Sequence, residues 1–421
     1  MKKFLNLFLV VAIIFSFVNF AHAEKYRLEK VLIFSRHNVR APLIAKNSPQ
    51  YNSTSQKWIE WTTKPGELTS RGGILETEMG QYFRKYLENE NFIPENYIPA
   101  ENEFKFYANS FQRTIATAQY FSSGMLPVAN VKVEHKYSVG SWDENFNMNF
   151  GNFDENFRQK VFNEIFTLHN AKNFQDMAEN LSPSLNQLES ILDFKNSPYA
   201  KEKNIQHFPT DDLKVTIEKN KSVSWQGGVQ LAASICDTLI MQNYEDPSTN
   251  NFIFGKKITP EQWDGVKNIH DFAIETVCGT PSIAVSFAKP MLKFLRQENS
   301  VDGRKFTFVC GHDTNVMSML TALGVERFSL PNTIERKIPI GVKFVVEKRI
   351  GTDGKEYAKV YLAYQNSEQI KNLEILSLEN PPQIFYLKFK GLTANEDGLY
   401  LYSDFEKRWN DTIEKAEKMS E

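Results

Sequence analysis

Residues 31–42, with the sequence VLIFSRHNVRAP, join an unbroken apolar run to two arginines and a histidine. An apolar run of this kind is typical of a strand that is covered on both faces, as in a parallel sheet. Arg36, His37 and Arg40 follow where this strand is expected to end. Because ligands of open α/β sheets bind beyond the carboxyl ends of the strands, the stretch predicts both a fold class and the position of a site.

Two later apolar runs end in the same way. Residues 104–108 lead to Arg113, and residues 306–310 lead to His312 and Asp313. If all three runs are parallel strands of one sheet, their ends meet at one edge of it. We therefore expect three arginines, two histidines and one aspartate to form one polar site from segments that lie far apart in the sequence.

Residues 143–300 differ from the rest of the chain because helical periodicity dominates there. We predict an α/β fold with a central, mostly parallel sheet flanked by helices and an inserted all-helical domain. Residues 24–142 and 301–421 would form the α/β catalytic domain, and residues 143–300 a mainly helical domain that covers the substrate pocket. The helices expected in that domain span 157–181, 225–244, 261–277 and 283–297.

The other elements of the α/β part can be placed from capping, turn and periodicity signals. The following are expected in chain order: a helix over 69–87 capped by Thr69, a strand around 131–135, a helix from Thr314 closed by Gly324, and a hairpin formed by 342–350 and 357–364.

The beginning of the chain has the pattern of a secretory signal peptide. Lys2 and Lys3 precede an apolar stretch that ends near Phe20, and Ala21-His22-Ala23 forms a small-x-small cleavage pattern. The alternative is an uncleaved membrane anchor, but the apolar stretch is short for a membrane span. We expect cleavage after Ala23 and a periplasmic protein without membrane attachment.

Charge and cysteine content narrow the choice of partners. The formal net charge is −2 and no basic arm or stripe is present, so nucleic acid is not expected as a partner. Three cysteines in a chain of this length do not make a disulfide framework. The sequence leaves undecided whether Cys236 and Cys278 form a single disulfide bridge, and it leaves the oligomeric state undecided as well. Cys310 is expected to be a buried thiol.

The predicted site has the charges that a phosphate monoester requires. A transferring phosphoryl group spreads negative charge over three oxygens, which positioned cations must match. The chain has 36 Lys but only 13 Arg, so chance is a poor explanation for three arginines at one site. Arginine, unlike lysine, can bind one phosphate through two N–H groups, which favours a phosphate-binding role for these three. Arg36, Arg40 and Arg113 can supply this charge, and we expect no metal or other cofactor.

The same site contains a nucleophile and an acid. Neutral His37 can attack phosphorus and form a phosphohistidine, while Asp313 protonates the departing oxygen and later activates water. His312 is expected to donate a hydrogen bond to a phosphate oxygen. We expect the arginines to lower the pKa of His37 and a desolvated setting beside phosphate to raise that of Asp313, giving an acid optimum. The remaining histidines show no spacing that indicates a site.

Other possible functions either require motifs that the sequence lacks or give no role to some of the predicted site residues. The sequence contains no Cys-x5-Arg loop, G-x-S-x-G elbow or His-Glu-x-x-His helix. A non-catalytic phosphate-binding protein would give no role to His37 between two arginines or to an aspartate beside the anion. A sugar-phosphate mutase would work mainly in the cytoplasm, which disagrees with the expected export.

Residues 36–42, together with Gly311-His312-Asp313, resemble the histidine acid phosphatase family, and Asn38 after the histidine is similar to the glucose-1-phosphatases within it. The resemblance implies an acid phosphatase acting on glucose 1-phosphate and related small monoesters, with a broad acid phosphatase or phytase as the alternative. It implies that His37 is the nucleophile and Asp313 the proton donor. The phosphate ligands that it implies are Arg36, Arg40, Arg113 and His312. Glu218 is the nearest match to a residue that contacts the sugar.

Overall fold

The computed structural model describes residues 25–147, 154–218, 223–246 and 252–419. The predicted signal peptide and its cleavage site lie outside these residues. The strands are β1 (Tyr26–Arg36), β2 (Phe104–Ala108), β3 (Lys214–Thr216), β4 (Ser224–Gln226), β5 (Phe252–Ile253), β6 (Lys256–Lys257), β7 (Phe306–Gly311), β8 (Lys343–Gly351), β9 (Glu356–Tyr364), β10 (Gln383–Tyr386) and β11 (Tyr400–Leu401). The helices are α1 (Pro49–Asn52), α2 (Ser70–Asn89), α3 (Gln112–Met125), α4 (Glu155–Leu168), α5 (Phe174–Asn180), α6 (Ser182–Leu192), α7 (Pro198–Lys203), α8 (Gly228–Glu245), α9 (Pro260–Ile274), α10 (Pro281–Asn299), α11 (Asp313–Ala322), α12 (Ser367–Asn372) and α13 (Tyr402–Lys418).

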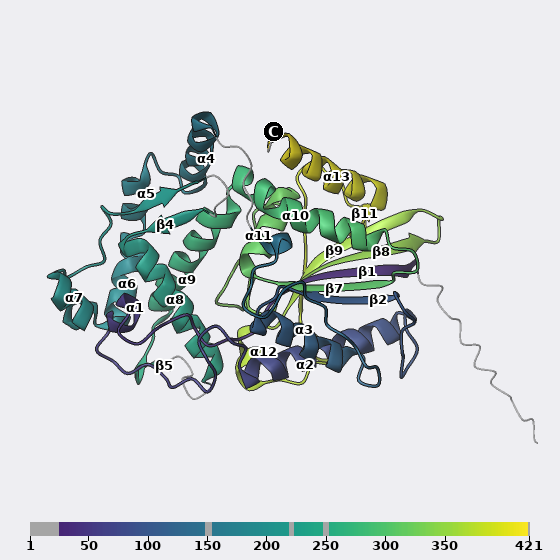
Figure 1. Cartoon of the computed structure of the whole chain (residues 1–421), viewed down its shortest axis with the longest axis horizontal. Helices are drawn as coiled ribbons and strands as arrows, with labels where there is room; N and C mark the ends of the chain where they lie inside the picture. Colours follow the sequence, from purple (N-terminus) through teal and green to yellow (C-terminus); the bar gives the residue numbers. More distant parts are fainter. Residues whose placement is uncertain (1–24, 148–153, 219–222, 247–251, 420–421) are drawn as a thin grey trace, which may run out of the picture.

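One central sheet organises the α/β part, in the order β10-β9-β8-β1-β7-β2, with β11 beside β9. Helices α2 and α3 cover one face of this sheet, and α10, α11 and α13 cover the other (Figure 1). The predicted α/β class with a central sheet flanked by helices is confirmed. Parallel pairing joins β1 to β7 and β7 to β2, whereas β8, β9, β10 and β11 pair in antiparallel fashion.

Strand β1 is buried on both of its faces, as its apolar run predicts. Val31 and Ile33 pack in the core beneath α2 and α3, whereas Leu32 and Phe34 belong to the core on the opposite face. This alternation follows from the two-residue period of a strand. The burial holds the end of β1 rigidly at the centre of the sheet, where the polar stretch begins.

Most helices between α4 and α9 form a separate group beside the sheet (Figure 1). Several contacts, including a hydrogen bond and a ring contact, join this group to the part of the chain that forms the sheet. Thr54, which follows α1, donates a hydrogen bond to the carbonyl oxygen of Leu192 at the end of α6 (2.7 Å). Phe146, which precedes α4 in the sequence, lies against Phe34 of β1, with 6.2 Å between the ring centroids.

Several sequence expectations differ from the structure in detail. The expected strand near 131–135 is wrong, because only Glu134 forms an isolated bridge, to Tyr107. The helix expected over 157–181 is broken into α4 and α5 by a turn in which Asn170 has a φ of 50°. By contrast, Thr69 caps α2 as predicted, accepting a hydrogen bond from the backbone of Gly72.

The three cysteines are free and buried in the structure, so the bridge left open between Cys236 and Cys278 is not formed. The buried state of Cys310 agrees with its prediction. In the part of the chain that the structure describes, none of the helices combines the length and the apolar character needed to cross a bilayer.

Candidate active site

The carboxyl ends of three strands meet at one edge of the sheet. The parallel register pairs Arg36 with Gly311 and Ala108 with Cys310. The backbone N–H of His37 donates to the carbonyl oxygen of Gly311 at 3.0 Å, which fixes the first two ends together. The structure therefore brings the segments that follow β1, β2 and β7 to one place, as the sequence predicted.

His37 is buried, and one hydrogen bond defines its protonation. Its Nδ1 lies 2.9 Å from the carbonyl oxygen of Asn38, and a carbonyl can only accept, so Nδ1 carries the proton. The lone pair is then on Nε2. Burial, followed by the charge of Arg113, lowers the pKa of His37 well below its usual value, so the ring stays neutral. The predicted direction is confirmed, although burial is a larger cause than the arginines.

A buried network holds the backbone behind His37. The side-chain amide of Asn38 donates to Glu76 at 2.8 Å, and its oxygen accepts from the backbone N–H of Val39. Glu76 is paired with Lys343 at 2.9 Å, and neither side chain is exposed. Since the carbonyl of Asn38 fixes the His37 tautomer, this network positions the histidine indirectly.

Asn109, which directly follows β2, fixes the second histidine. Its Oδ1 accepts from the backbone N–H groups of Ser110 (2.9 Å) and Asp143 (3.2 Å), so its amide nitrogen must face His312. That nitrogen lies 2.9 Å from His312 Nε2, which therefore accepts, and the proton resides on Nδ1. His312 Nδ1 lies 3.4 Å from Arg113 Nη2, so two nitrogen donors lie side by side at the site.

Two arginines at the site, Arg36 and Arg113, have N–H donors that make no hydrogen bond within the described part of the chain. Arg36 is fully buried and holds Glu335 and the carbonyl oxygen of Ile338 through Nη1. The Nε groups of Arg36 and Arg113 are buried without a hydrogen-bond acceptor among the described residues. Burial also lowers the pKa of Arg113 to about 10, which still leaves it charged at working pH. Unpaired buried donors are costly, and a bound phosphate would satisfy them.

Asp313 begins α11 and lies 3.1 Å from Arg36 Nη2. Its pKa differs in direction from the sequence prediction. Burial acts to raise this pKa, but the charges of Arg36, His312 and His270 outweigh burial and lower it to about 2. The expected rise is therefore wrong for the protein by itself, because the sequence did not reveal how close Arg36 lies to the carboxylate.

Three residues near the site were missed from the sequence. Arg40 Nη2 bonds to both carboxylate oxygens of Asp237 on α8, at 3.1 and 3.0 Å. Glu335 is buried as the partner of Arg36, and His270 Nε2 on α9 lies 3.9 Å from it. Asp237 had a signal, because it is the only charge between Gly228 and the final Glu of α8.

Glu218 was predicted from the resemblance to contact a sugar. It is exposed and lies two residues after β3, in the helical part of the chain. The other six predicted site residues instead lie at or after the ends of the buried strands β1, β2 and β7, which bring them together. Its contact with substrate stays a prediction.

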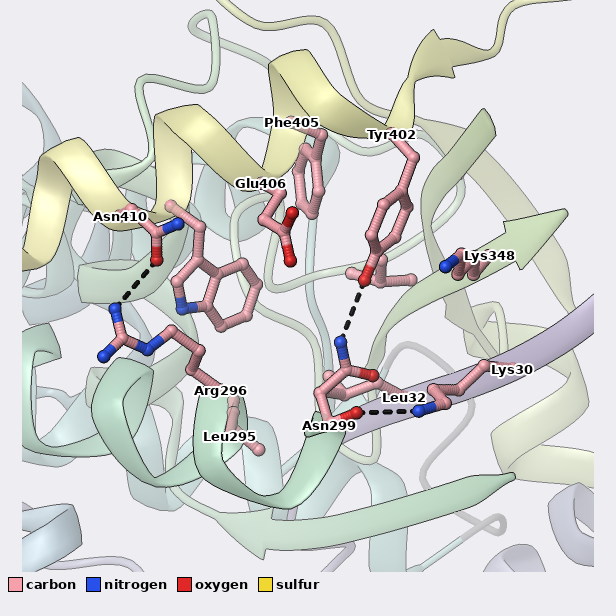
Figure 2. A pocket seen from close by; sticks show the side chains of 12 residues that line it. Lys30, Leu32, Leu295, Arg296, Asn299, Lys348, Tyr402, Phe405, Glu406 and Asn410 are labelled. Carbon is pink, nitrogen blue, oxygen red and sulfur yellow. Dashed lines mark hydrogen bonds between the residues drawn. The ribbon is translucent and has the colours of Figure 1, made fainter. Parts of the chain in front are cut away.

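Figure 2 shows a hollow beside Lys30 and Leu32 in the middle of β1, whereas the site follows the carboxyl end of this strand. It lies between α10, α13, β1 and β8 and has a volume of about 40 Å³. Its polar groups bond to one another: Lys30 to the carbonyl oxygen of Asn299 (2.7 Å), and Asn299 to Tyr402 (2.9 Å). A cavity of this size holds little more than a water molecule, so it is a packing gap between the two helices and the sheet.

Comparisons with known proteins agree with this geometry. A model of the histidine phosphatase superfamily (branch 2) matches residues 27–215. The chain is 32% identical to glucose-1-phosphatase of Salmonella typhimurium over 92% of this chain and 93% of the relative, and 26% identical to the phytase AppA of Escherichia coli over 86% and 87%. The solved structure of Hafnia alvei phytase has the same fold, with a TM-score of 0.83, 24% identity and coverage of 93% and 98%. With its strand-end arginines and histidines, the chain thus belongs to branch 2 of the histidine phosphatase superfamily and is a phosphoric monoester hydrolase of the histidine acid phosphatase type.

Proposed function

We propose that the chain hydrolyses glucose 1-phosphate and related small phosphate monoesters through a phosphohistidine on His37. The observation that carries the proposal is the free Nε2 of a buried, neutral His37 whose ring centroid lies 5.6 Å from that of His312. Relatives from Salmonella typhimurium and Providencia rettgeri are both glucose-1-phosphatases, at 32% and 31% identity. A broad acid phosphatase or phytase is the alternative.

In the first step, His37 Nε2 donates its lone pair to phosphorus, and the bond from phosphorus to the ester oxygen breaks. Arg36, Arg40, Arg113 and the Nδ1–H of His312 hold the three remaining oxygens and match their charge. The buried Nε donors of Arg36 and Arg113 support this role. Since the arginines supply the positive charge, we expect activity to persist in a chelator and to need no added divalent ion.

The leaving alkoxide needs a proton, and Asp313 is the proposed donor. Because its pKa is lowered to about 2, Asp313 enters the reaction ionised at mildly acid pH. The second pKa of a phosphate monoester is roughly 6, so below that pH the substrate itself carries the proton in as a monoanion. Once the proton passes from phosphate to Asp313, the dianion occupies the arginines and the acid can protonate the leaving oxygen.

In the second step, the Asp313 carboxylate takes a proton from water as the water oxygen attacks phosphorus. The bond from phosphorus to His37 Nε2 breaks, and Asp313 passes its proton to the product. Phosphate leaves as the monoanion, which returns the enzyme to its starting state with Asp313 ionised. This proton path predicts that kcat/KM falls about tenfold for each pH unit above roughly 6. A flat profile up to pH 8 would contradict the entry of the proton with the substrate.

The proposal extends to domains and location. Residues 143–300 would form a mainly helical domain over the substrate side, and Asp237, which reaches Arg40 from α8, supports this division. Glu218 stays a proposed sugar contact. We also propose export to the periplasm with cleavage after Ala23, which N-terminal sequencing of the mature protein would test.

A substrate panel tests the function directly. Rates would be measured at acid pH on glucose 1-phosphate, glucose 6-phosphate, phytate and an aryl phosphate, with His37→Ala as the inactive control. We expect the highest kcat/KM on glucose 1-phosphate among the natural esters. Comparable rates on all four would favour the broad acid phosphatase, a preference for phytate would favour the phytase, and phosphate binding without turnover would contradict both.

A further inference from the structure

A small aromatic cluster borders the site on the side of His312. The Trp142 ring lies 4.8 Å from Phe111 and 5.2 Å from His312, measured between ring centroids. Phe111 precedes α3 and lies 5.9 Å from His312, and the guanidinium of Arg113 stands 4.9 Å from the Phe111 ring. Two of the proposed phosphate ligands therefore contact aromatic rings from two separate segments.

The backbone that carries Trp142 is fixed. The N–H of Asp143 donates to Asn109, and the N–H of Gly140 donates to the carbonyl oxygen of Ser110 at 2.7 Å. Trp142 itself is nevertheless 49% exposed, whereas Phe111 is partly buried. Packing against His312 and Phe111 thus uses only part of the indole, and the remaining apolar surface stays free beside the site.

We infer that Trp142, supported by Phe111, is the platform on which the sugar ring of the leaving group rests. The inference depends on the proposed function, because it concerns the group that the phosphoryl transfer releases. The leaving group is joined to phosphorus through one oxygen, so a ring attached there lies close to His312 and to the aromatic surface beside it. A pyranose presents apolar C–H groups on its faces and hydroxyls at its edge, and a flat aromatic ring matches such a face.

The charge around the site supports the same class of leaving group. Asp237 holds Arg40 and is itself one quarter exposed, so its carboxylate can accept hydrogen bonds from neutral hydroxyls. The same negative charge disfavours further phosphate groups on the leaving group. An aromatic platform together with a carboxylate therefore selects a neutral, ring-bearing alcohol over a polyphosphorylated one.

The test compares esters with and without a ring in Trp142→Ala and Trp142→Phe. Glucose 1-phosphate carries the ring, glycerol 3-phosphate does not, and inorganic phosphate reports on the phosphate ligands through competitive inhibition. Tyr386→Ala is the matched control, because Tyr386 is 53% exposed and lies on β10 at the far edge of the sheet.

For Trp142→Ala we expect kcat/KM on glucose 1-phosphate to fall on the order of tenfold, mainly through KM, the scale of an aromatic contact. Trp142→Phe should recover most of this loss, and Tyr386→Ala should show none. The values for glycerol 3-phosphate and inorganic phosphate should stay within about twofold of wild type in all variants.

An equal loss on both esters and on phosphate inhibition would overturn the inference, because Trp142 would then only support His312. No loss on any substrate would overturn it as well. Failure of the wild type to prefer glucose 1-phosphate refutes the proposed function separately. In that case the ratio of an aryl phosphate to glycerol 3-phosphate, measured in the same variants, decides whether the platform exists.

Discussion

The two ends of the site are built differently. The phosphate end consists of buried side chains at the ends of three hydrogen-bonded strands, and the tautomers of His37 and His312 are fixed by neighbouring amides and carbonyls. The leaving-group end consists of partly exposed side chains, Trp142 on a loop and Asp237 on a helix of the other part of the chain. The residues that act on the phosphoryl group, which all substrates share, are thus held in a rigid geometry. The residues that distinguish one leaving alcohol from another lie on a more exposed surface.

This difference suggests how changes at the two ends should act. A change in an arginine that binds the phosphate should damage every substrate equally, because all substrates share the phosphoryl group. A change at the leaving-group end should alter the ratio between substrates and leave phosphate binding intact. Substitutions at both ends therefore test whether the two ends have these separate roles.

The largest effect is expected for Arg36→Lys. Lysine keeps a positive charge beside Glu335 but loses the planar fork, so kcat/KM should fall on the order of 1000-fold for every ester alike. The matched control is Arg304→Lys, because Arg304 is also buried and paired with a glutamate, Glu298, but lies outside the site. A loss confined to some esters would contradict the comparison.

Asp313→Asn should separate substrates by leaving group. Asparagine cannot give a proton, so glucose 1-phosphate should lose on the order of 100-fold in the phosphorylation step, while an aryl phosphate should lose little. The measurement is the single-turnover rate against leaving-group pKa for wild type and variant. Equal slopes would mean that another group is the acid.

The same substitution should change the pH dependence of stability. The pKa of Asp313 is lowered to about 2 in the folded protein, so its ionised form stabilises the fold above about pH 5, and this contribution is lost as pH falls through 2. The difference from the ordinary aspartate pKa of 3.8 corresponds to about 2 kcal/mol. Urea unfolding at pH 5 and pH 2 should show this extra loss in wild type only.

Buried His37 disfavours the folded state in acid in both proteins and so cancels in this comparison. His312 does not cancel, because the charge of Asp313 acts to raise its pKa against the larger effect of burial, and the substitution removes that charge. Asp411→Asn serves as the control, because Asp411 is an exposed partner of Lys407 on α13. Identical pH dependence in wild type and Asp313→Asn would show that the ion pair with Arg36 does not stabilise the fold.

A smaller effect is expected for Asp237→Asn. The amide keeps an oxygen for Arg40 but removes a negative charge near the phosphate ligands, so inorganic phosphate should inhibit about threefold to tenfold more tightly. Activity on phytate should rise relative to glucose 1-phosphate, because the repulsion of additional phosphates is reduced. Weaker phosphate inhibition would show that orienting Arg40 matters more than the charge.

Much of the fold was predictable because the decisive signals are local. The run at 31–34 and the strand over 104–108 identify buried strands, and Thr69 identifies a helix start. The break between α4 and α5 was not predictable from apolar periodicity, since the pattern continues through the turn at Asn170. The expected strand near 131–135 failed because most of its residues find no strand to pair with.

The site was predictable where strand ends determine it. The convergence of Arg36, His37 and His312 follows from parallel pairing, which apolar runs reveal. The ion pair between Arg36 and Asp313 and the contact of Trp142 with His312 depend on side-chain directions that no local pattern encodes. For this reason the pKa of Asp313 was predicted to rise, whereas it is lowered in the structure.

The most direct test of the mechanism is to trap the phosphorylated enzyme. Rapid base quench of wild type with labelled substrate, followed by peptide mapping, should show one phosphoryl group on His37 that is stable in base and is lost when the sample is acidified. Asp313→Asn should accumulate more of this species with an aryl phosphate, because hydrolysis of the phosphohistidine is slowed. His37→Ala should show none. Turnover by His37→Ala, or label on another residue, would contradict the role of His37 as nucleophile.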